Sequence, residues 1–315
     1  MKYRALVAGA ALAVTAPALS APAQASAGTA ASAANPAAAS APARAAATVR
    51  GVYFDYKDGG VQVTTGPGGR QVTIPSSGGS FVGQFSASPD GGRVAWIDDK
   101  GRLHVRSAAG DKVVATGAAY GGPCVTPAWS ADGRRIAFPR RGDSEAATVA
   151  AVGASGGRVT VLGRTPGPCH LAWSADGRTL AGYAGDTAGV HLLDTRTHRS
   201  RKAPGIRLAN HVGSVSPDGR RVVVNAISAN APGGDGSWPA WYSPSVYDTT
   251  TGKKIALPVK GRALSAHYLR DGRLAVRVKG ASANTLVVLD RSGKEVRRVT
   301  EPASARRLGL LGVTG

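Results

Sequence analysis

The tetrapeptide Ser88-Pro89-Asp90-Gly91 is the first of a series of related turns that decides the fold of this 315-residue chain. Related tetrapeptides stand at 130–133, 174–177 and 216–219, and a degenerate Leu-Arg-Asp-Gly stands at 269–272. Their aspartates are 42, 44, 42 and 53 residues apart. Self-similarity at a nearly constant period of this length is the signature of a repeat architecture.

Each tetrapeptide has the composition of a tight turn between two antiparallel strands. Ser opens a type I turn, Pro or Ala suits the second position, Asp bonds to nearby backbone, and Gly accepts a positive φ. Apolar, β-branched runs follow the turns, as at 94–97, 136–138, 180–183, 222–224 and 274–276. Third and fourth apolar runs complete the units, as at 190–194 and 113–115. Four strands in about 42 residues predict one blade of a β-propeller.

The turn, with the Arg and the apolar strand that follow it, resembles the TolB-type, WD-like propeller repeat. The resemblance covers residues 49–315, and families with such repeats include the periplasmic TolB propeller and the propeller of prolyl oligopeptidases. Similarity of repeats transfers a fold further than a function. Peptidase activity is not implied, because no α/β domain follows the propeller to supply a nucleophile elbow.

The blade count depends on the two ends of the repeat region. Five units carry a turn, and an N-terminal stretch from 52 to 74 supplies three more strands. The apolar segment 308–313 is available as the missing strand of that first blade, and such closure would protect an open sheet edge. We therefore predict an all-β, six-bladed β-propeller of four-stranded antiparallel blades, closed by a C-terminal strand that completes the first blade.

The N-terminal 48 residues differ in composition from the repeats. Lys2 and Arg4, an apolar run at 5–19 and the sequence Ala23-Gln24-Ala25 have the order of a secretory signal, cleaved after Ala25. A membrane anchor is the alternative, but the run is shorter than the roughly 20 apolar residues that span a bilayer. Residues 26–48 are nearly all Ala, Pro and Ser, which predicts a flexible linker. We expect a signal peptide at 1–25, a linker at 26–48 and a propeller at 49–315, with the mature protein secreted or associated with the cell envelope and without a membrane span.

Charge and cysteine content extend this interpretation. The chain has 39 Lys and Arg against 19 Asp and Glu, and this excess favours an anionic partner such as a cell-envelope polymer. No nucleic-acid-binding motif accompanies the charge, so no nucleic-acid partner is expected. Two cysteines in an exported chain most economically form one disulfide, and Cys124 and Cys169 occupy equivalent places in successive repeats. A metal or catalytic role for either Cys is the minor alternative.

The longest departure from the repeat is the insertion at 228–243, which links the second and third strands of its blade. Its aromatic residues Trp238, Trp241 and Tyr242 are candidates to stack on a sugar ring or an aliphatic partner, because loops on rigid scaffolds carry recognition. The alternative is that the loop folds back and buries its aromatic residues over the blade.

Two further sets of residues recur with the repeat. An Arg follows the turn Gly in every unit, which predicts a basic rim on the propeller, made of Arg93, Arg134, Arg178, Arg220 and Arg273. The alternative is that each Arg pairs with the Asp of its own or a neighbouring turn. His170, His211 and His267 fall on three innermost strands around the channel, but they stand at different distances from their turns, which disfavours a shared metal ion. No metal and no cofactor are expected.

The function that we predict is non-catalytic binding. The propeller would present its loop-decorated face to a cell-envelope component or a protein partner, and the protein is expected to be a monomer. A propeller-type lyase or hydrolase with its active site at the channel mouth is the alternative, because such sites leave little trace in a sequence.

Overall fold

The computed structural model describes residues 48–57, 60–65, 69–76, 83–142, 146–231 and 236–315. The predicted signal peptide and all but the last residue of the predicted linker lie outside these ranges. Over the described residues, no helix is both long enough and apolar enough to cross a membrane.

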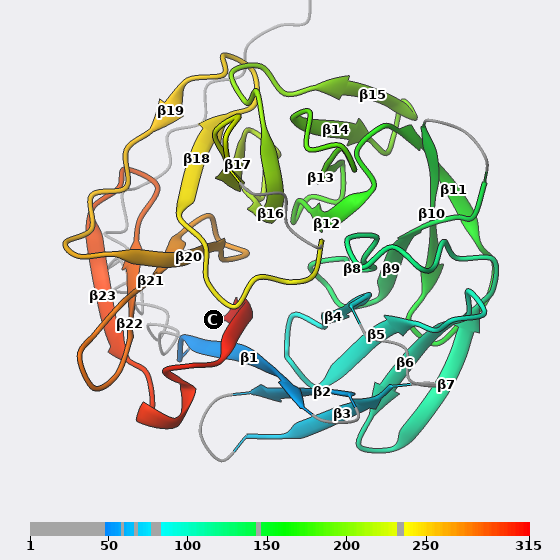
Figure 1. Ribbon diagram of the computed structural model, residues 1–315, viewed down its shortest axis with the longest axis horizontal. Helices are drawn as coiled ribbons and strands as arrows, with labels where there is room; N and C mark the ends of the chain where they lie inside the picture. The colour runs from blue at the N-terminus through cyan, green and yellow to red at the C-terminus, as the bar shows by residue number, and fades with distance from the viewer. Residues whose placement is uncertain (1–47, 58–59, 66–68, 77–82, 143–145, 232–235) are drawn as a thin grey trace, which may run out of the picture. The chain divides into compact units, whose positions relative to one another are not determined.

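Six four-stranded antiparallel sheets form a ring of blades, which confirms the predicted six-bladed propeller (Figure 1). From the inner strand outward, blade 1 consists of β24 (Gly309–Thr314), β1 (Arg50–Lys57), β2 (Gly60–Thr65) and β3 (Gln71–Pro75). Blade 2 consists of β4 (Phe85–Ala87), β5 (Arg93–Ile97), β6 (Leu103–Ser107) and β7 (Gly110–Ala115). Blade 3 consists of β8 (Ala128–Trp129), β9 (Arg135–Pro139), β10 (Ala147–Gly153) and β11 (Thr160–Thr165).

The remaining three blades follow the same order. Blade 4 consists of β12 (Cys169–Trp173), β13 (Thr179–Tyr183), β14 (Val190–Asp194) and β15 (Arg199–Lys202). Blade 5 consists of β16 (Ala209–Val215), β17 (Arg221–Ala226), β18 (Pro244–Asp248) and β19 (Lys254–Ile255). Blade 6 consists of β20 (Ala263–Tyr268), β21 (Leu274–Val278), β22 (Thr285–Leu289) and β23 (Glu295–Thr300), and the short 3-10 helix η1 (Ala303–Ala305) leads from it to β24.

The repeated turn is held by its own side chains. In the first turn, the Ser88 hydroxyl donates to Asp90 at 2.5 Å and accepts from the backbone N–H of Arg93 at 3.0 Å. The Asp90 carboxylate accepts the N–H of Gly92 at 3.0 Å. The next three turns repeat these contacts, and every turn glycine has a positive φ, as predicted: Gly91, Gly133, Gly177, Gly219 and Gly272. We call the end of the propeller that carries these five turns the turn face, and the opposite end, with the insertion at 228–243, the loop face.

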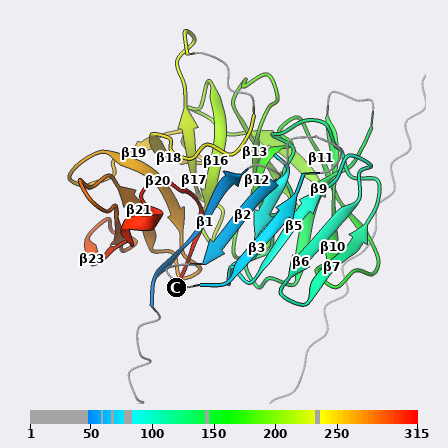
Figure 2. The same ribbon diagram turned by 60° about the horizontal axis from the view of Figure 1, so that its bottom comes forward.

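The C-terminal strand completes blade 1, as predicted. β24 is antiparallel to β1, with Gly309 opposite Phe54 and Thr314 opposite Arg50. The core fills the spaces between neighbouring blades, whose sheets lie face to face in the tilted view of Figure 2. Leu103 of blade 2 shares a cluster with Phe138 of blade 3, and Leu286 of blade 6 shares one with Leu310 of blade 1. The last strand therefore joins the two ends of the chain's repeat region through both hydrogen bonds and apolar packing.

Candidate functional site

Residues 236–243 of the insertion cross the loop-face end of the central channel instead of folding over their own blade. The insertion leaves blade 5 after β17 and returns to the same blade at β18 (Figure 1). The Trp238 indole N–H donates to the carbonyl oxygen of Phe85 on β4 at 2.7 Å. The Tyr56 hydroxyl of blade 1 donates to the Trp238 carbonyl at 3.5 Å. The insertion thus spans several blades.

Two of the three predicted ligand-binding aromatic residues are buried in this crossing. Trp238 and Tyr242 are each 8% exposed, whereas Trp241 is 47% exposed. The Trp238 ring stacks on His170, with centroids 4.7 Å apart and planes at 4°, and the Tyr242 ring meets His211 edge-on at 4.5 Å. The alternative of burial therefore holds for Trp238 and Tyr242. Of the three, Trp241 is the side chain that a ligand can reach.

The histidines of the inner strands support the insertion. His170 and His211 share a hydrogen bond of 2.7 Å between their Nδ1 atoms, and Nε2 of His170 lies 2.8 Å from the carbonyl oxygen of Gly236. Because a carbonyl oxygen only accepts, Nε2 of His170 is the donor there. Burial lowers the pKa of His211 well below its ordinary range, and the neighbouring His170 lowers it further. Within the described ranges, no group of three His, Cys, Asp or Glu side chains is arranged to hold a metal ion.

Acidification is expected to destabilise the propeller through His267 on β20. Burial is the largest influence and lowers the pKa of His267 from 6.5 to about 4. Between these two values the unfolded chain binds a proton that the folded chain does not, so the free energy of unfolding falls as pH falls, by about 3 kcal/mol for this group. Urea unfolding at pH 7 and pH 4.5 measures the change. The variant His267→Leu should lose the His267 share of the pH dependence while the share of the buried His211 remains, and an unchanged dependence would assign all of it to other groups.

The predicted disulfide is present beside the insertion. Cys124 and Cys169 are bonded, with Cα atoms 4.7 Å apart, and they join the connection before β8 to the start of β12. Gly236 of the insertion packs on this bridge, because a Cβ atom added to Gly236 would lie 3.0 Å from Cβ of Cys124. In the chain-entropy estimate, a bridge between residues this far apart in sequence stabilises by about 3 to 4 kcal/mol.

The central channel holds a cavity that reaches the turn face. This cavity of about 210 Å³ is lined by residues of all six inner strands and by Trp238 of the insertion. The second residue of each repeated turn surrounds its mouth: Pro89, Ala131, Ala175, Pro217 and Arg270. Trp238 therefore connects the insertion to the wall of the channel.

Comparisons with known proteins bear on the fold. No protein-family model matches the chain, and no curated protein matches it in sequence. The crystal structure of TolB from Acinetobacter baumannii aligns with a TM-score of 0.51 and 14% identity, over 84% of this chain and 65% of that one. The chain therefore spans slightly less than two thirds of the length of that protein. The chain has the TolB-like propeller fold.

Two other solved structures align less well. A putative TolB from Agrobacterium tumefaciens has a TM-score of 0.48 and 14% identity, over 84% of this chain and 97% of that one. A chain of a nidogen/laminin complex has a TM-score of 0.49 and 10% identity, over 85% of this chain and 98% of that one. At these identities the likeness concerns the propeller fold alone.

The predicted basic rim of this TolB-like propeller divides into two kinds of residue. Arg134, Arg178 and Arg220 are exposed on the turn face, whereas Arg273 pairs with Asp271 of its own turn at 2.7 Å. Arg93 occupies a different repeat position from the other four arginines. Its backbone N–H bonds to the hydroxyl of the turn Ser, and in later repeats the residues that make this bond are Arg135, Thr179 and Arg221. The expectation of one equivalent ring is wrong in that respect.

Arginines at this second position join neighbouring blades. The Arg93 guanidinium lies 4.8 Å from the centroid of the Trp129 ring on the next blade, and Arg135 lies 4.9 Å from that of Trp173. In the following repeat, Thr179 takes the place of the Arg and Val215 takes the place of the Trp. Such cation–π contacts contribute about 0.5–2 kcal/mol each. Arg93 and Arg135 therefore help to hold neighbouring blades together. The periodicity of the sequence alone does not reveal this structural role.

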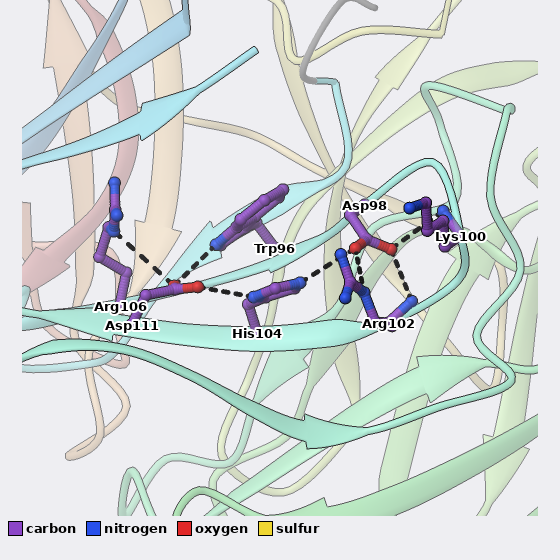
Figure 3. A network of polar contacts seen from close by, with 7 residues as sticks. All are labelled: Trp96, Asp98, Lys100, Arg102, His104, Arg106 and Asp111. Atoms are coloured by element: carbon purple, nitrogen blue, oxygen red, sulfur yellow. Dashed lines mark hydrogen bonds and ion pairs between the residues drawn. The ribbon is translucent and has the colours of Figure 1, made fainter. Parts of the chain in front are cut away.

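A polar network in blade 2 was not evident from the sequence (Figure 3). His104 lies between two carboxylates, 2.6 Å from Asp111 and 3.1 Å from Asp98, and its ring stacks on Trp96 at 4.2 Å. Burial raises the pKa of Asp98, but hydrogen bonds from the backbone and side chain of Arg102 and from His104 outweigh it and lower that pKa to about 2. All of these residues belong to one blade or its turn, so the network stabilises blade 2.

One short motif that resembles a hydrolase signature has a structural role instead. The letters G-x-S-x-G occur at 153–157, a pattern that in hydrolases marks a nucleophile between a strand and a helix. Here the segment forms the turn from β10 to β11, and the Ser155 carbonyl oxygen accepts a hydrogen bond from Lys112 at 2.8 Å. The described residues therefore place no nucleophile elbow at this motif.

Proposed function

We propose that this TolB-like propeller is a secreted, non-catalytic binding module that recognises a cell-envelope component or a protein partner through its loop face. The observation that carries the proposal is the exposure of Trp241 between two buried anchors. Trp238 and Tyr242 hold the insertion on either side, so the Trp241 ring is presented without the cost of ordering a free loop. Rigid, partly exposed aromatic side chains are frequent centres of recognition.

A pocket lies beside the exposed ring of Trp241. A pocket of about 290 Å³ is lined by Trp241 together with residues of blade 6 and of the connection to β24. Leu264 forms part of its wall, and the backbone N–H of Tyr242 donates to the Leu264 carbonyl at 2.8 Å. A ligand in this pocket would contact a rigid blade on one side and an aromatic face on the other.

We expect Trp241→Ala to weaken binding to a detergent-washed cell-envelope fraction by about tenfold or more, because loss of a central aromatic contact costs roughly 1–3 kcal/mol. Co-sedimentation at increasing protein concentration measures the affinity, and circular dichroism verifies the fold. The matched control is Tyr120→Ala, which removes another exposed aromatic residue near blades 2 and 3. Equal binding by Trp241→Ala and the unaltered protein would reject the loop face as the recognition surface.

A further inference from the structure

The pocket beside Trp241 is bordered by four cations from three separate segments. Arg262 precedes β20, Lys279 follows β21, and Arg306 and Arg307 lie in the connection between β23 and β24. In the part of the chain that the structure describes, no carboxylate lines this pocket and no ion pair neutralises these four side chains. Uncompensated like charges gathered around one concave surface attract anions.

The backbone that carries the two arginines is fixed from inside the protein. The guanidinium of Arg277, whose side chain is 0% exposed, donates to the carbonyl oxygens of Ala305 at 2.6 Å and Leu308 at 2.7 Å. These two carbonyls flank Arg306 and Arg307 in sequence. The buried Asn284 side chain donates to the Arg306 carbonyl at 3.0 Å. The four cations therefore belong to ordered segments and not to free loops.

The opposite wall of the pocket is equally ordered. The backbone N–H of Lys279 donates to the Arg262 carbonyl at 2.9 Å, which holds these two cationic residues together at one end of blade 6. Beside them, the buried ring of Tyr242 donates its hydroxyl to the Ala266 carbonyl at 3.3 Å and so fixes the neighbouring Trp241. A preorganised site loses less conformational entropy when a ligand binds.

The combination of one aromatic ring with several cations indicates the chemistry of the ligand. Arg forms paired, charge-assisted hydrogen bonds with phosphate and carboxylate groups, and Lys contributes a point charge. An indole face packs against the apolar side of a ring. Proteins that follow single-stranded nucleic acid use successive aromatic platforms, one for each stacked base, whereas a single exposed Trp lines this pocket. The arrangement favours a glycan that carries its own negative charge.

We propose that Trp241, Arg262, Lys279, Arg306 and Arg307 form a binding site for an anionic glycan, a polymer in which sugar or polyol units carry phosphodiester or carboxylate groups. This inference rests on the proposed function, because it names the ligand class of the same loop face. The Trp241 ring packs against a sugar or polyol unit, and the cations bind the anionic groups on either side of it.

The decisive experiment compares two triple variants that lose the same charge on opposite faces. Arg262→Gln/Lys279→Gln/Arg307→Gln removes three cations from the pocket, and Arg134→Gln/Arg178→Gln/Arg220→Gln removes three exposed cations from the turn face. Calorimetry measures binding to deacylated lipoteichoic acid, to polygalacturonate, to neutral dextran and to oligo-dT. Circular dichroism and thermal unfolding verify that both variants fold.

We expect the unaltered protein to bind at least one of the two anionic polymers and not dextran. The pocket variant should lose about tenfold or more in affinity and show a weaker salt dependence, because fewer counterions are released, whereas the turn-face variant should change less than about twofold. The polymer that binds distinguishes the phosphodiester source from the carboxylate source. Trp241→Ala should also weaken binding of the same polymer.

Several results would overturn this assignment. Equal losses in both triple variants would indicate a general charge effect, and tighter binding of oligo-dT than of either glycan would indicate nucleic acid. No binding to either anionic polymer would reject the ligand class. If the pocket variant keeps its affinity for the envelope fraction while Trp241→Ala loses it, an anionic glycan is rejected as the ligand, and binding through the loop face is still supported. If Trp241→Ala keeps its affinity for that fraction, the proposed function itself fails.

Discussion

Removal of residues 305–315 is expected to abolish the propeller fold. The deletion takes away β24, which supplies the inner strand of blade 1 and packs the buried Leu310 against blade 6. It would leave an unpaired edge on β1 next to the channel, and such an edge promotes aggregation. It also removes the carbonyl oxygens of Ala305 and Leu308 that accept from the buried Arg277. Thermal unfolding followed by circular dichroism, with gel filtration, should show no cooperative transition and little soluble monomer.

A pair of single substitutions tests the same closure without shortening the chain. A Cβ atom added to Gly309 would lie 2.0 Å from the buried Phe54 ring, whereas one added to Gly312 meets nothing within 4 Å. We therefore expect Gly309→Ala to cost about 1–3 kcal/mol through overpacking, and Gly312→Ala to be nearly neutral. A truncated protein that melts at the normal temperature, or equal effects of the two alanines, would show that the ring closes elsewhere.

The blade architecture could be predicted because it depends on contacts that are local in sequence. The Ser88 hydroxyl, the Asp90 carboxylate and the positive φ of Gly91 act within one turn, and the repeat displays them several times. The closing role of 308–313 followed from counting strands, because a lone apolar segment had one vacant place in the ring. These inferences needed no knowledge of which distant side chains meet.

The functional surface could be predicted only in part, because it depends on contacts that the repeat does not display. The insertion was identified by its length, but the burial of Trp238 follows from its bond to Phe85, 153 residues away. The site of the four cations draws on segments near 262, 279 and 306, which meet only once blade 6 and the closing connection are in place. The sequence gives their total charge and not their proximity.

Arg277 was likewise unmarked in the sequence, where it stands within the apolar run of β21. It forms a buried ion pair with Glu301 at 2.8 Å, and the Tyr53 hydroxyl donates to the other carboxylate oxygen at 3.0 Å. Burial and the Glu301 charge raise the pKa of Tyr53, which keeps its hydroxyl protonated as a donor. This cluster joins blade 1, blade 6 and the connection that carries the two arginines of the proposed glycan site.

We expect Glu301→Gln to lower the free energy of unfolding by about 3–5 kcal/mol, because it leaves the buried Arg277 guanidinium without a counter-charge. Urea unfolding at pH 7 measures the loss. The matched control is Glu295→Gln, which breaks the exposed pair between Glu295 and Arg298, both on β23, and should cost less than about 1 kcal/mol.

The double variant Arg277→Met/Glu301→Leu separates the charge from the packing. If an unpaired buried charge causes the loss, removing both charges should recover a large part of the stability, since hydrophobic replacements of buried pairs are often neutral or stabilising. The double variant should nevertheless bind the anionic glycan more weakly than the unaltered protein, because it lacks the two guanidinium hydrogen bonds to the Ala305 and Leu308 carbonyls that help to fix the backbone of Arg306 and Arg307. A double variant as unstable as Glu301→Gln would show that the connection depends on the geometry of the guanidinium and not on neutralising its charge.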